Sequence, residues 1–305
     1  MARQQPLLFA LKSHPLMRLL CERLPAAQGR LQTRSFPDGE SYLQVVTEVK
    51  GRHCFVLSDL SDPNDKFLPL VFLCETLRDL GAASVGLVAP YLCYMRQDRR
   101  FVEGEAVTSR IFAGLVSRQF DWLVTVDPHL HRYESLDEIY SIPSRVVQGA
   151  PALSQWLLGE SDVFLVGPDA ESEQWVSRIA ELSGHPYVIG EKIRRGDRDV
   201  SISLPPLSDL GEKTAVIIDD VISSGHTVLE CMRALQEKGI KKIDCACIHG
   251  IFAGGIDQTL LDNGLGRLVS CNTIVHSSNS LDISALLAAP INEFLKGLTN
   301  VSQDK

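Results

Sequence analysis

The sequence predicts an α/β protein of two domains, each with a mostly parallel central sheet. Short apolar runs that suit buried parallel strands alternate with helical patterns of about 15 residues. The length of 305 residues also exceeds the size at which a single hydrophobic core usually keeps growing. We therefore expect one domain over residues 1–145 and a second over 146–305, with roughly the last 20 residues free to pack back on the first domain.

The expected elements follow one another in the alternating order of such a fold. Candidate strands are Cys54–Leu57, Val85–Ala89, Trp122–Val126, Val163–Val166, Ala215–Ile218 and Ile243–Ile248. Candidate helices are Asp65–Leu80, Thr108–Phe120, Glu173–Ser183 and Val228–Lys238. The turn-rich stretch Ser141–Pro151 is the expected boundary, and the similar strand order on its two sides suggests a duplication.

Composition narrows the possible partners and the compartment. A net charge of −8 argues against broad attraction to nucleic acid or to an anionic membrane. The eight cysteines have no zinc-binding spacing, which favours reduced thiols in a cytoplasmic protein. Lys12, His14 and Arg18 interrupt the apolar start too early for a signal peptide or a spanning helix. We expect a cytoplasmic protein that binds neither nucleic acid nor membrane.

The run VIIDDVISSGHT, from Val216 to Thr227, carries the strongest chemical signal. An apolar strand leads to Asp219 and Asp220, whose carboxylates can accept hydrogen bonds from the vicinal hydroxyls of a sugar. A loop then opens a helix, and its amides and small hydroxyls can receive a phosphate. This loop comprises Ser223, Ser224, Gly225, His226 and Thr227. An ordinary strand-to-helix turn with solvated carboxylates is the alternative.

Two segments of the first half carry groups that suit a nucleotide. In RQDRR, Arg96, Arg99 and Arg100 supply forked donors and Gln97 supplies an amide edge, although such a run is often only a solvated basic face. Further along, Asp127 and His129 alternate just after a buried strand, so both can face one side of the sheet edge and hold a metal or a phosphate. A histidine that is simply satisfied in the core is the alternative there.

Taken together, these segments resemble a known family. VIIDDVISSGHT is similar to the phosphoribosyl pyrophosphate (PRPP) fingerprint that type I phosphoribosyltransferases share with ribose-phosphate pyrophosphokinases, the PRPP synthetases. Only the latter have the other segments in this order: FPDGE at Phe36–Glu40, Asn64 through YLCYMRQDRR to Arg100, VDPH at Val126–His129, HGIFAGG at His249–Gly255, and CNTIVHSSNSLDISALLAAPI. The resemblance covers almost the whole chain.

The resemblance implies two phosphoribosyltransferase-type, Rossmann-like domains, each with a five-stranded sheet, and an active site between them. It implies transfer of the β,γ-diphosphoryl group of Mg-ATP to the anomeric hydroxyl of ribose 5-phosphate, which gives PRPP and AMP. The first domain would carry the ATP side and the oligomer contacts, and the second would bind ribose 5-phosphate. A homo-oligomer, whether dimer, tetramer or hexamer, is implied because the family shares its ATP site between subunits.

Residue roles follow from the same resemblance. ATP would be bound by Arg96, Gln97, Arg99 and His129, and by Phe36, Asp38 and Glu40 reaching the adenine from a neighbouring subunit. His129 and Asp169 would hold Mg²⁺. The charged segment Gly190–Ile202 resembles the flexible catalytic loop, and its Lys192 and Arg194 would stabilise the transferring phosphates.

Some positions depart from the family pattern. Glu171 and Ser172 replace two glycines that usually cradle pyrophosphate, and Phe101 replaces an acid. In the sugar loop, Ser223 and Ser224 stand where many members carry Asp and Thr, and His226 replaces a small residue. The segments DPHLHRY, EKIRRGD and IIDDVISSGHT together resemble the archaeal-type branch of the family. Two alternatives stay open: a PRPP-consuming type I phosphoribosyltransferase, and a non-catalytic regulatory relative.

Overall fold

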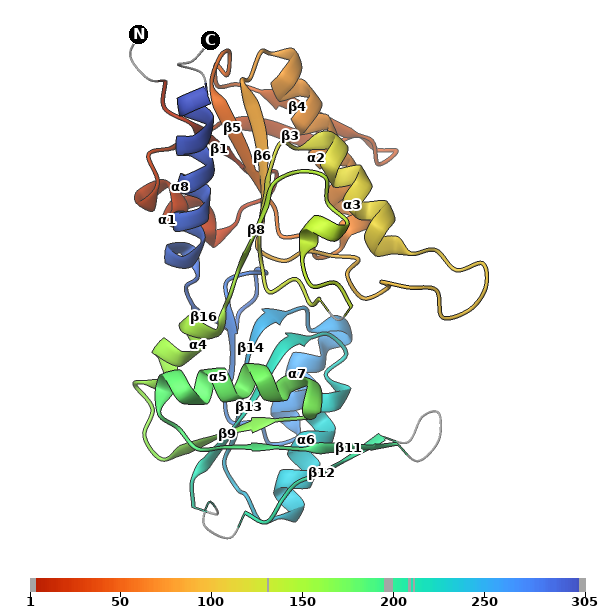
Figure 1. Ribbon diagram of the computed structural model, residues 1–305, viewed down its shortest axis with the longest axis vertical. Helices are drawn as coiled ribbons and strands as arrows, with labels where there is room; N and C mark the ends of the chain where they lie inside the picture. The colour runs from red at the N-terminus through yellow and green to blue at the C-terminus, as the bar shows by residue number, and fades with distance from the viewer. Residues whose placement is uncertain (1–3, 131, 195–199, 208–209, 211, 302–305) are drawn as a thin grey trace. The chain divides into compact units, whose positions relative to one another are not determined.

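The chain divides into two compact units. A computed structural model describes residues 4–130, 132–194, 200–207, 210 and 212–301 (Figure 1). Unit 1 contains Met1–Gln148 together with Ser284–Lys305, and unit 2 contains Gly149–Ile283. No helix in the described part of the chain is both long and apolar enough to cross a bilayer.

Unit 1 is built on a six-stranded sheet whose neighbouring strands are all parallel, in the order β2-β1-β5-β6-β7-β8. The strands are β1 (Leu7–Phe9), β2 (Ala27–Gln28), β5 (His53–Leu57), β6 (Ser84–Ala89), β7 (Leu123–Val126) and β8 (Ser144–Val147). Its helices are α1 (Pro15–Arg23), α2 (Pro63–Asp79), α3 (Thr108–Gln119) and α8 (Ser284–Val301), with the 3₁₀ turn η1 (Leu136–Glu138). An antiparallel hairpin of β3 (Leu31–Ser35) and β4 (Ser41–Val45) stands apart from this sheet.

The C-terminal helix α8 belongs to unit 1, although unit 2 precedes it in the chain. It packs against α1, β7 and β8. Its Phe294 stacks on Trp122 with ring centroids 4.9 Å apart and planes tilted by 15°. Trp122 lies so close to β6 that a Cβ on Gly86 would be 2.0 Å from its ring, so this position requires glycine. The aromatic stack therefore ties the end of the chain to the first sheet.

Unit 2 repeats the construction, with six parallel strands in the order β10-β9-β13-β14-β15-β16. The strands are β9 (Val163–Gly167), β10 (Tyr187–Ile189), β13 (Thr214–Ile222), β14 (Ile243–Gly250), β15 (Leu268–Cys271) and β16 (Asn279–Leu281). Its helices are α4 (Ala150–Leu157), α5 (Glu173–Ser183), α6 (His226–Glu237) and α7 (Ile256–Asp262), with 3₁₀ turns η2 (Ala170–Ser172) and η3 (Ala253–Gly255). The antiparallel pair β11 (Glu191–Arg194) and β12 (Val200–Ser203) again stands outside the main sheet.

The α/β class with two mostly parallel sheets is confirmed, whereas the expected five strands per sheet was wrong because each sheet has six. Strands that are buried along their whole length, such as β6, β9 and β14, are the apolar runs visible in the sequence. The additional strands are short ones such as β2 and β16, in which polar side chains interrupt the apolar pattern.

Candidate functional site

Strand β13 of unit 2 carries both predicted aspartates beyond the point where its neighbour ends. Its last residue paired with β9 is Ile217, whereas its pairing with β14 continues to Ile222. Asp219 and Asp220 lie in this overhang at the carboxyl end of the sheet, and both are half-buried. The strand thus runs through the two acids instead of ending at Ile218 as expected. This is the edge at which open α/β sheets place their ligands.

The carboxylates at this edge crowd one another. Burial raises the pKa of Asp219 well above its usual value, and the negative charges of Asp220 and Asp169 raise that pKa further. The Asp220 amide donates to Asp219 Oδ1 at 2.9 Å, and the Val221 amide donates to Asp220 Oδ1 at 2.8 Å. The arrangement favours an incoming cation or hydroxyl donor, because either one offsets the repulsion between the carboxylates.

The loop after β13 leads into α6, which begins at His226 and not near Val228 as the sequence suggested. Gly225 is the N-cap in the left-handed region (φ 65°), and no side chain caps the helix. A Cβ on Gly225 would lie 2.3 Å from Ile256 Cγ1. Backbone freedom and close packing therefore both require glycine here. The uncapped amides of the first turn are the groups that bind an anion at a helix N-terminus.

The remaining predicted loop residues surround this helix start. Ser223 and Thr227 are half-buried, whereas Ser224 and His226 are exposed. The Ser223 carbonyl accepts a hydrogen bond from the Ala253 amide at 3.0 Å, so the turn near η3 fixes the loop. Ala253 belongs to the HGIFAGG segment, which begins at the end of β14. Its role in holding this loop could not be predicted from the sequence, because it depends on the pairing of β13 with β14.

Asp169 lies in the turn after β9, which closes on itself. The Asp169 side chain accepts from the Ser172 amide at 3.2 Å, and the Ser172 hydroxyl donates to the Asp169 carbonyl at 2.5 Å. The two residues form a reciprocal capping box, so Ser172 has a local structural role where the family pattern has glycine. Glu171 is exposed. The D-x-x-S spacing is a sequence signal that could have predicted this turn.

Lys192 lies on β11 and faces the same turn. Its Nζ is 3.9 Å from Asp169 Oδ2. We expected Gly190–Ile202 to be a loop throughout. Instead its two arms pair, Lys192 with Ile202 and Arg194 with Val200. The connection 195–199 is outside the described residues. The structure therefore brings together Asp169, Lys192, Asp219 and Asp220 in unit 2.

The fit to Mg²⁺ depends on a bound substrate. In the described ranges, no group of three or more His, Cys, Asp or Glu side chains has a metal-binding arrangement. Mg²⁺ is commonly held by one or two carboxylates together with substrate phosphates and water. The crowded carboxylates around Asp219 offer hard oxygen donors of this kind. These residues therefore fit Mg²⁺ only if substrate oxygens complete its coordination.

In unit 1, the RQDRR loop is anchored by a residue that the sequence analysis did not select. Asp98 is buried, and both of its carboxylate oxygens accept from Arg132 Nη1, at 2.7 and 2.9 Å. The Tyr133 hydroxyl donates to the Asp98 carbonyl at 3.1 Å. Asp98 thereby ties this loop to the segment that follows VDPH. The sequence analysis did not predict the pair of Asp98 and Arg132, because composition does not show which acid of a charged run is buried.

The predicted nucleotide ligands in this loop differ in their surroundings. Arg96 is exposed, whereas Gln97 is half-buried and its Oε1 accepts from Thr108 Oγ1 at 3.3 Å. The Arg99 guanidinium lies 4.8 Å from the centre of the Phe101 ring. Phe101 is 59% exposed, so this residue remains accessible to a ligand.

The VDPH turn after β7 is strained. Asp127 (φ 32°) and His129 (φ 54°) both have positive φ angles, which non-glycine residues seldom adopt. Strain of this kind costs roughly 1–3 kcal/mol per residue and is concentrated at functional sites. Both residues are half-buried. This geometry distinguishes His129 from an ordinary core histidine.

The FPDGE segment forms the tip of the β3–β4 hairpin, where Phe36, Asp38 and Glu40 are exposed. The Phe36 amide donates to the Glu40 carbonyl at 2.7 Å, and Gly39 (φ 93°) makes the turn. The Arg34 guanidinium lies 4.5 Å from the centre of the Phe36 ring. The tip is therefore ordered by local contacts and presents an aromatic ring beside two carboxylates.

Comparison with known proteins identifies relatives along nearly the whole chain. Residues 7–119 match the N-terminal domain of ribose phosphate pyrophosphokinase, and residues 135–280 match the phosphoribosyl transferase domain. The ribose-phosphate pyrophosphokinase of Methanopyrus kandleri is 32% identical over 289 residues, covering 93% of this chain and 96% of the relative. That of Sulfurisphaera tokodaii is 30% identical over 269 residues, covering 86% and 91%.

A solved structure supports the fold. The phosphoribosylpyrophosphate synthetase of Mycobacterium smegmatis superposes with a TM-score of 0.82 at 23% identity, covering 96% of this chain and 100% of that structure. The fold is therefore shared along 96% of this chain.

Proposed function

The chain belongs to the ribose-phosphate pyrophosphokinase family, and we propose that it transfers the β,γ-diphosphoryl group of Mg-ATP to the anomeric hydroxyl of ribose 5-phosphate, giving PRPP and AMP. One observation in this chain supports the proposal most: Asp219 and Asp220 overhang β9, and a short loop leads from them to an uncapped helix N-terminus. Carboxylates that accept from sugar hydroxyls thus adjoin amides that receive a phosphate.

In unit 2, the proposed roles follow the chemistry of each group. Asp219 and Asp220 accept hydrogen bonds from the ribose hydroxyls. The 5-phosphate is received by the loop Ser223, Ser224, Gly225, His226 and Thr227. The half-buried position of both acids and the left-handed Gly225 support this assignment, because they hold the donors and acceptors rigidly before the ligand arrives.

In unit 1, we assign the nucleotide to Arg96, Gln97, Arg99 and His129. The anchoring of this loop through Asp98 and the strained turn at His129 support the assignment. The exposed Phe36, Asp38 and Glu40 would reach the adenine bound by a neighbouring copy of the chain. A homo-oligomer is part of the proposal for that reason, and an exposed hairpin tip with its own internal contacts is consistent with it.

Mg²⁺ would be held by His129 and Asp169 together with phosphate oxygens of ATP, and it would neutralise charge that develops on those oxygens. Lys192 and Arg194 are proposed to stabilise the transferring group. The 3.9 Å separation of Lys192 Nζ and Asp169 Oδ2 supports a handover: without substrate the lysine is paired with Asp169, and the phosphates of ATP then replace that partner.

A cytoplasmic location is also proposed. All eight cysteines are free, and seven of them are buried, as expected for a protein kept in a reducing compartment. Burial raises the pKa of the Cys54 and Cys74 thiols to about 12, so neither is a reactive thiolate at neutral pH.

A product assay tests the function. The protein is incubated with Mg-ATP and ribose 5-phosphate, and AMP and PRPP are quantified. We expect equal amounts of both, and no AMP when ribose 5-phosphate is omitted. If the protein instead releases pyrophosphate from PRPP and a free base, it is a phosphoribosyltransferase; if no turnover occurs although ATP and ribose 5-phosphate both bind, it is a non-catalytic relative.

A further inference from the structure

The two units repeat one plan, and the repeat places a second set of polar side chains at the position of the sugar site. In each unit, the first strand leads through a helix to an edge strand on one side (β1–α1–β2 and β9–α5–β10). After a separate hairpin, the chain resumes on the other side of the first strand, at β5 and at β13. The point where the strand order reverses therefore lies between β1 and β5 in unit 1, and between β9 and β13 in unit 2.

The strand registers put Asp59 of unit 1 at the place that Asp220 has in unit 2. Phe9 with Val56 is the last pair between β1 and β5, and Val166 with Ile217 is the last pair between β9 and β13. Asp59 is the third residue after Val56, and Asp220 is the third residue after Ile217. Both carboxylates thus overhang the first strand at the carboxyl end of their sheet.

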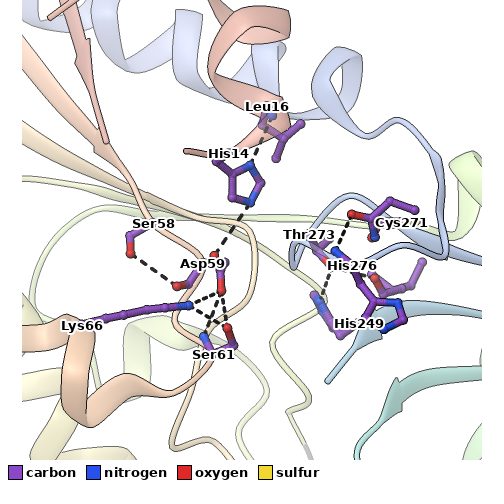
Figure 2. Close-up of polar contacts among 12 residues, drawn as sticks. His14, Leu16, Ser58, Asp59, Ser61, Lys66, His249, Cys271, Thr273 and His276 are labelled. Carbon is purple, nitrogen blue, oxygen red and sulfur yellow. Dashed lines mark hydrogen bonds and ion pairs between the residues drawn. The ribbon is translucent and has the colours of Figure 1, made fainter. Parts of the chain in front are cut away.

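Asp59 lies in a network of donors (Figure 2). Its Oδ1 accepts from Lys66 Nζ at 2.5 Å, and also from the Ser61 hydroxyl. Lys66 Nζ donates in addition to Ser61 Oγ at 2.7 Å. His14 Nε2 is 3.9 Å from Asp59 Oδ2, while its Nδ1 accepts from the Leu16 amide at 3.2 Å, which leaves the ring proton on Nε2. We name Asp59, Ser61, Lys66 and His14 the switch-point cluster.

The switch-point cluster is neither core nor ordinary surface. The side chains of Asp59 and Lys66 are each 13% exposed, so both are largely desolvated but remain accessible. A desolvated ion pair commonly stabilises a fold no better than apolar residues of similar volume. The cluster brings together the N-cap of α1, the loop after β5 and the start of α2 at the sheet edge where such folds bind ligands, so a binding role explains these ionic groups better than stability does.

The chemistry of the cluster selects its ligand. Asp59 and Lys66 compensate each other in charge, so this ion pair has no net charge that would attract a phosphate. The start of helix α2 also lacks a side-chain capping bond, but it differs from that of α6 in charge and in donors: its N-cap residue Asp62 is negatively charged, and Pro63 removes an amide from its first turn. The start of α2 therefore disfavours an anion, although it occupies the position in unit 1 that corresponds to the proposed 5-phosphate site of unit 2. A vicinal diol fits, because each hydroxyl can donate to a carboxylate and accept from an ammonium or hydroxyl group.

We propose that the switch-point cluster is a second carbohydrate site, which takes the vicinal diol of an unphosphorylated ribofuranose on Asp59, Ser61 and Lys66. The proposal is independent of the catalytic assignment, because it concerns unit 1 and needs neither ATP nor the 5-phosphate.

Saturation-transfer NMR on the full-length protein with methyl β-D-ribofuranoside tests this. The methyl group blocks the anomeric hydroxyl, so the probe cannot be a substrate of the proposed reaction. We expect saturation of the C2 and C3 ring protons, and roughly tenfold or greater loss of affinity in Asp59→Asn, because the hydrogen bond to a charged acceptor is lost. The matched variant Asp220→Asn should bind the riboside as the wild type does, while losing ribose 5-phosphate.

A ligand-side control does not depend on the folding of any variant. Methyl 2-deoxy-β-D-ribofuranoside lacks one hydroxyl of the diol and should bind the wild type roughly tenfold more weakly or worse. The proposal is overturned if the two ribosides bind equally, if Asp59→Asn binds as the wild type does, if no saturation transfer occurs, or if inorganic phosphate displaces the riboside. If the protein binds the riboside through Asp59 but does not form AMP, the proposed carbohydrate site stands and the proposed catalytic function fails.

Discussion

Gly225→Ala is the substitution for which the structure gives the most definite consequence. Gly225 has φ 65°, and an added Cβ would lie 2.3 Å from Ile256 Cγ1. A non-glycine residue in the left-handed region costs roughly 1–2 kcal/mol. Overpacking of a tight contact costs about 1–3 kcal/mol more. We therefore expect the free energy of unfolding to fall by about 2–5 kcal/mol.

Gly184→Ala is the matched control. Gly184 ends α5 with φ 75°, and a Cβ there meets nothing within 4 Å. It should cost only the backbone share of roughly 1–2 kcal/mol and leave ribose 5-phosphate binding unchanged. Gly225→Ala should also weaken ribose 5-phosphate at least tenfold, because the loop amides move away from the 5-phosphate.

Urea denaturation and calorimetric titration with ribose 5-phosphate measure the two effects. Ile256→Ala, which removes Cγ1 and Cδ1, should relieve the Gly225→Ala defect. The double variant should therefore lose less stability than the sum of the two single losses. Strictly additive losses, or a Gly225→Ala variant no worse than Gly184→Ala, would refute the contact as the cause.

Three other outcomes are expected. Lys192→Ala should lower turnover at least roughly a hundredfold while ribose 5-phosphate still binds, and near-normal turnover would remove this lysine from the mechanism. The raised pKa of Asp219 means that the folded state holds this proton more tightly than the unfolded chain, so the unfolding free energy should fall as pH rises from 3.8 through the raised pKa. Asp219→Asn should abolish that fall in urea titrations between pH 4 and 8, and an unchanged pH dependence would contradict the burial and the crowding of this carboxylate. Phe294→Ala removes the stack on Trp122 and should cost about 2 kcal/mol and expose α8 to limited proteolysis, whereas wild-type resistance would show that the stack does not hold the helix.

The sequence predicted those parts of the fold whose signal is local. Strands such as β9 and β14 are buried on both faces and read as apolar runs, and α5 lies where its amphipathic pattern predicted it. Strand β2 has only two residues and β10 only three, which is too short for any periodicity to be recognised. Their places are set by pairing with distant strands, which a local pattern cannot report.

In the candidate site, too, the sequence predicted what depends on a local pattern and not what depends on contacts between distant residues. Asp219 and Asp220 follow an apolar strand, so the sequence located them, but the overhang past β9 that makes them neighbours of Asp169 depends on strand register. The bond between Asp98 and Arg132 joins residues 34 positions apart and is invisible in a charged run. Nothing in the sequence around Asp59 singled this residue out, because its correspondence to Asp220 is recognised only when the strand orders of the two sheets are compared.

The central claim is that the anomeric oxygen of ribose 5-phosphate attacks the β-phosphorus of ATP. Ribose 5-phosphate labelled with ¹⁸O at C1 is mixed with Mg-ATP and the protein in ordinary water, and the products are analysed by ³¹P NMR and mass spectrometry. Attack at the β-phosphorus predicts that the label bridges C1 and the diphosphate of PRPP, with none in AMP. Label in AMP, or PRPP whose bridging oxygen comes from ATP, would contradict the account.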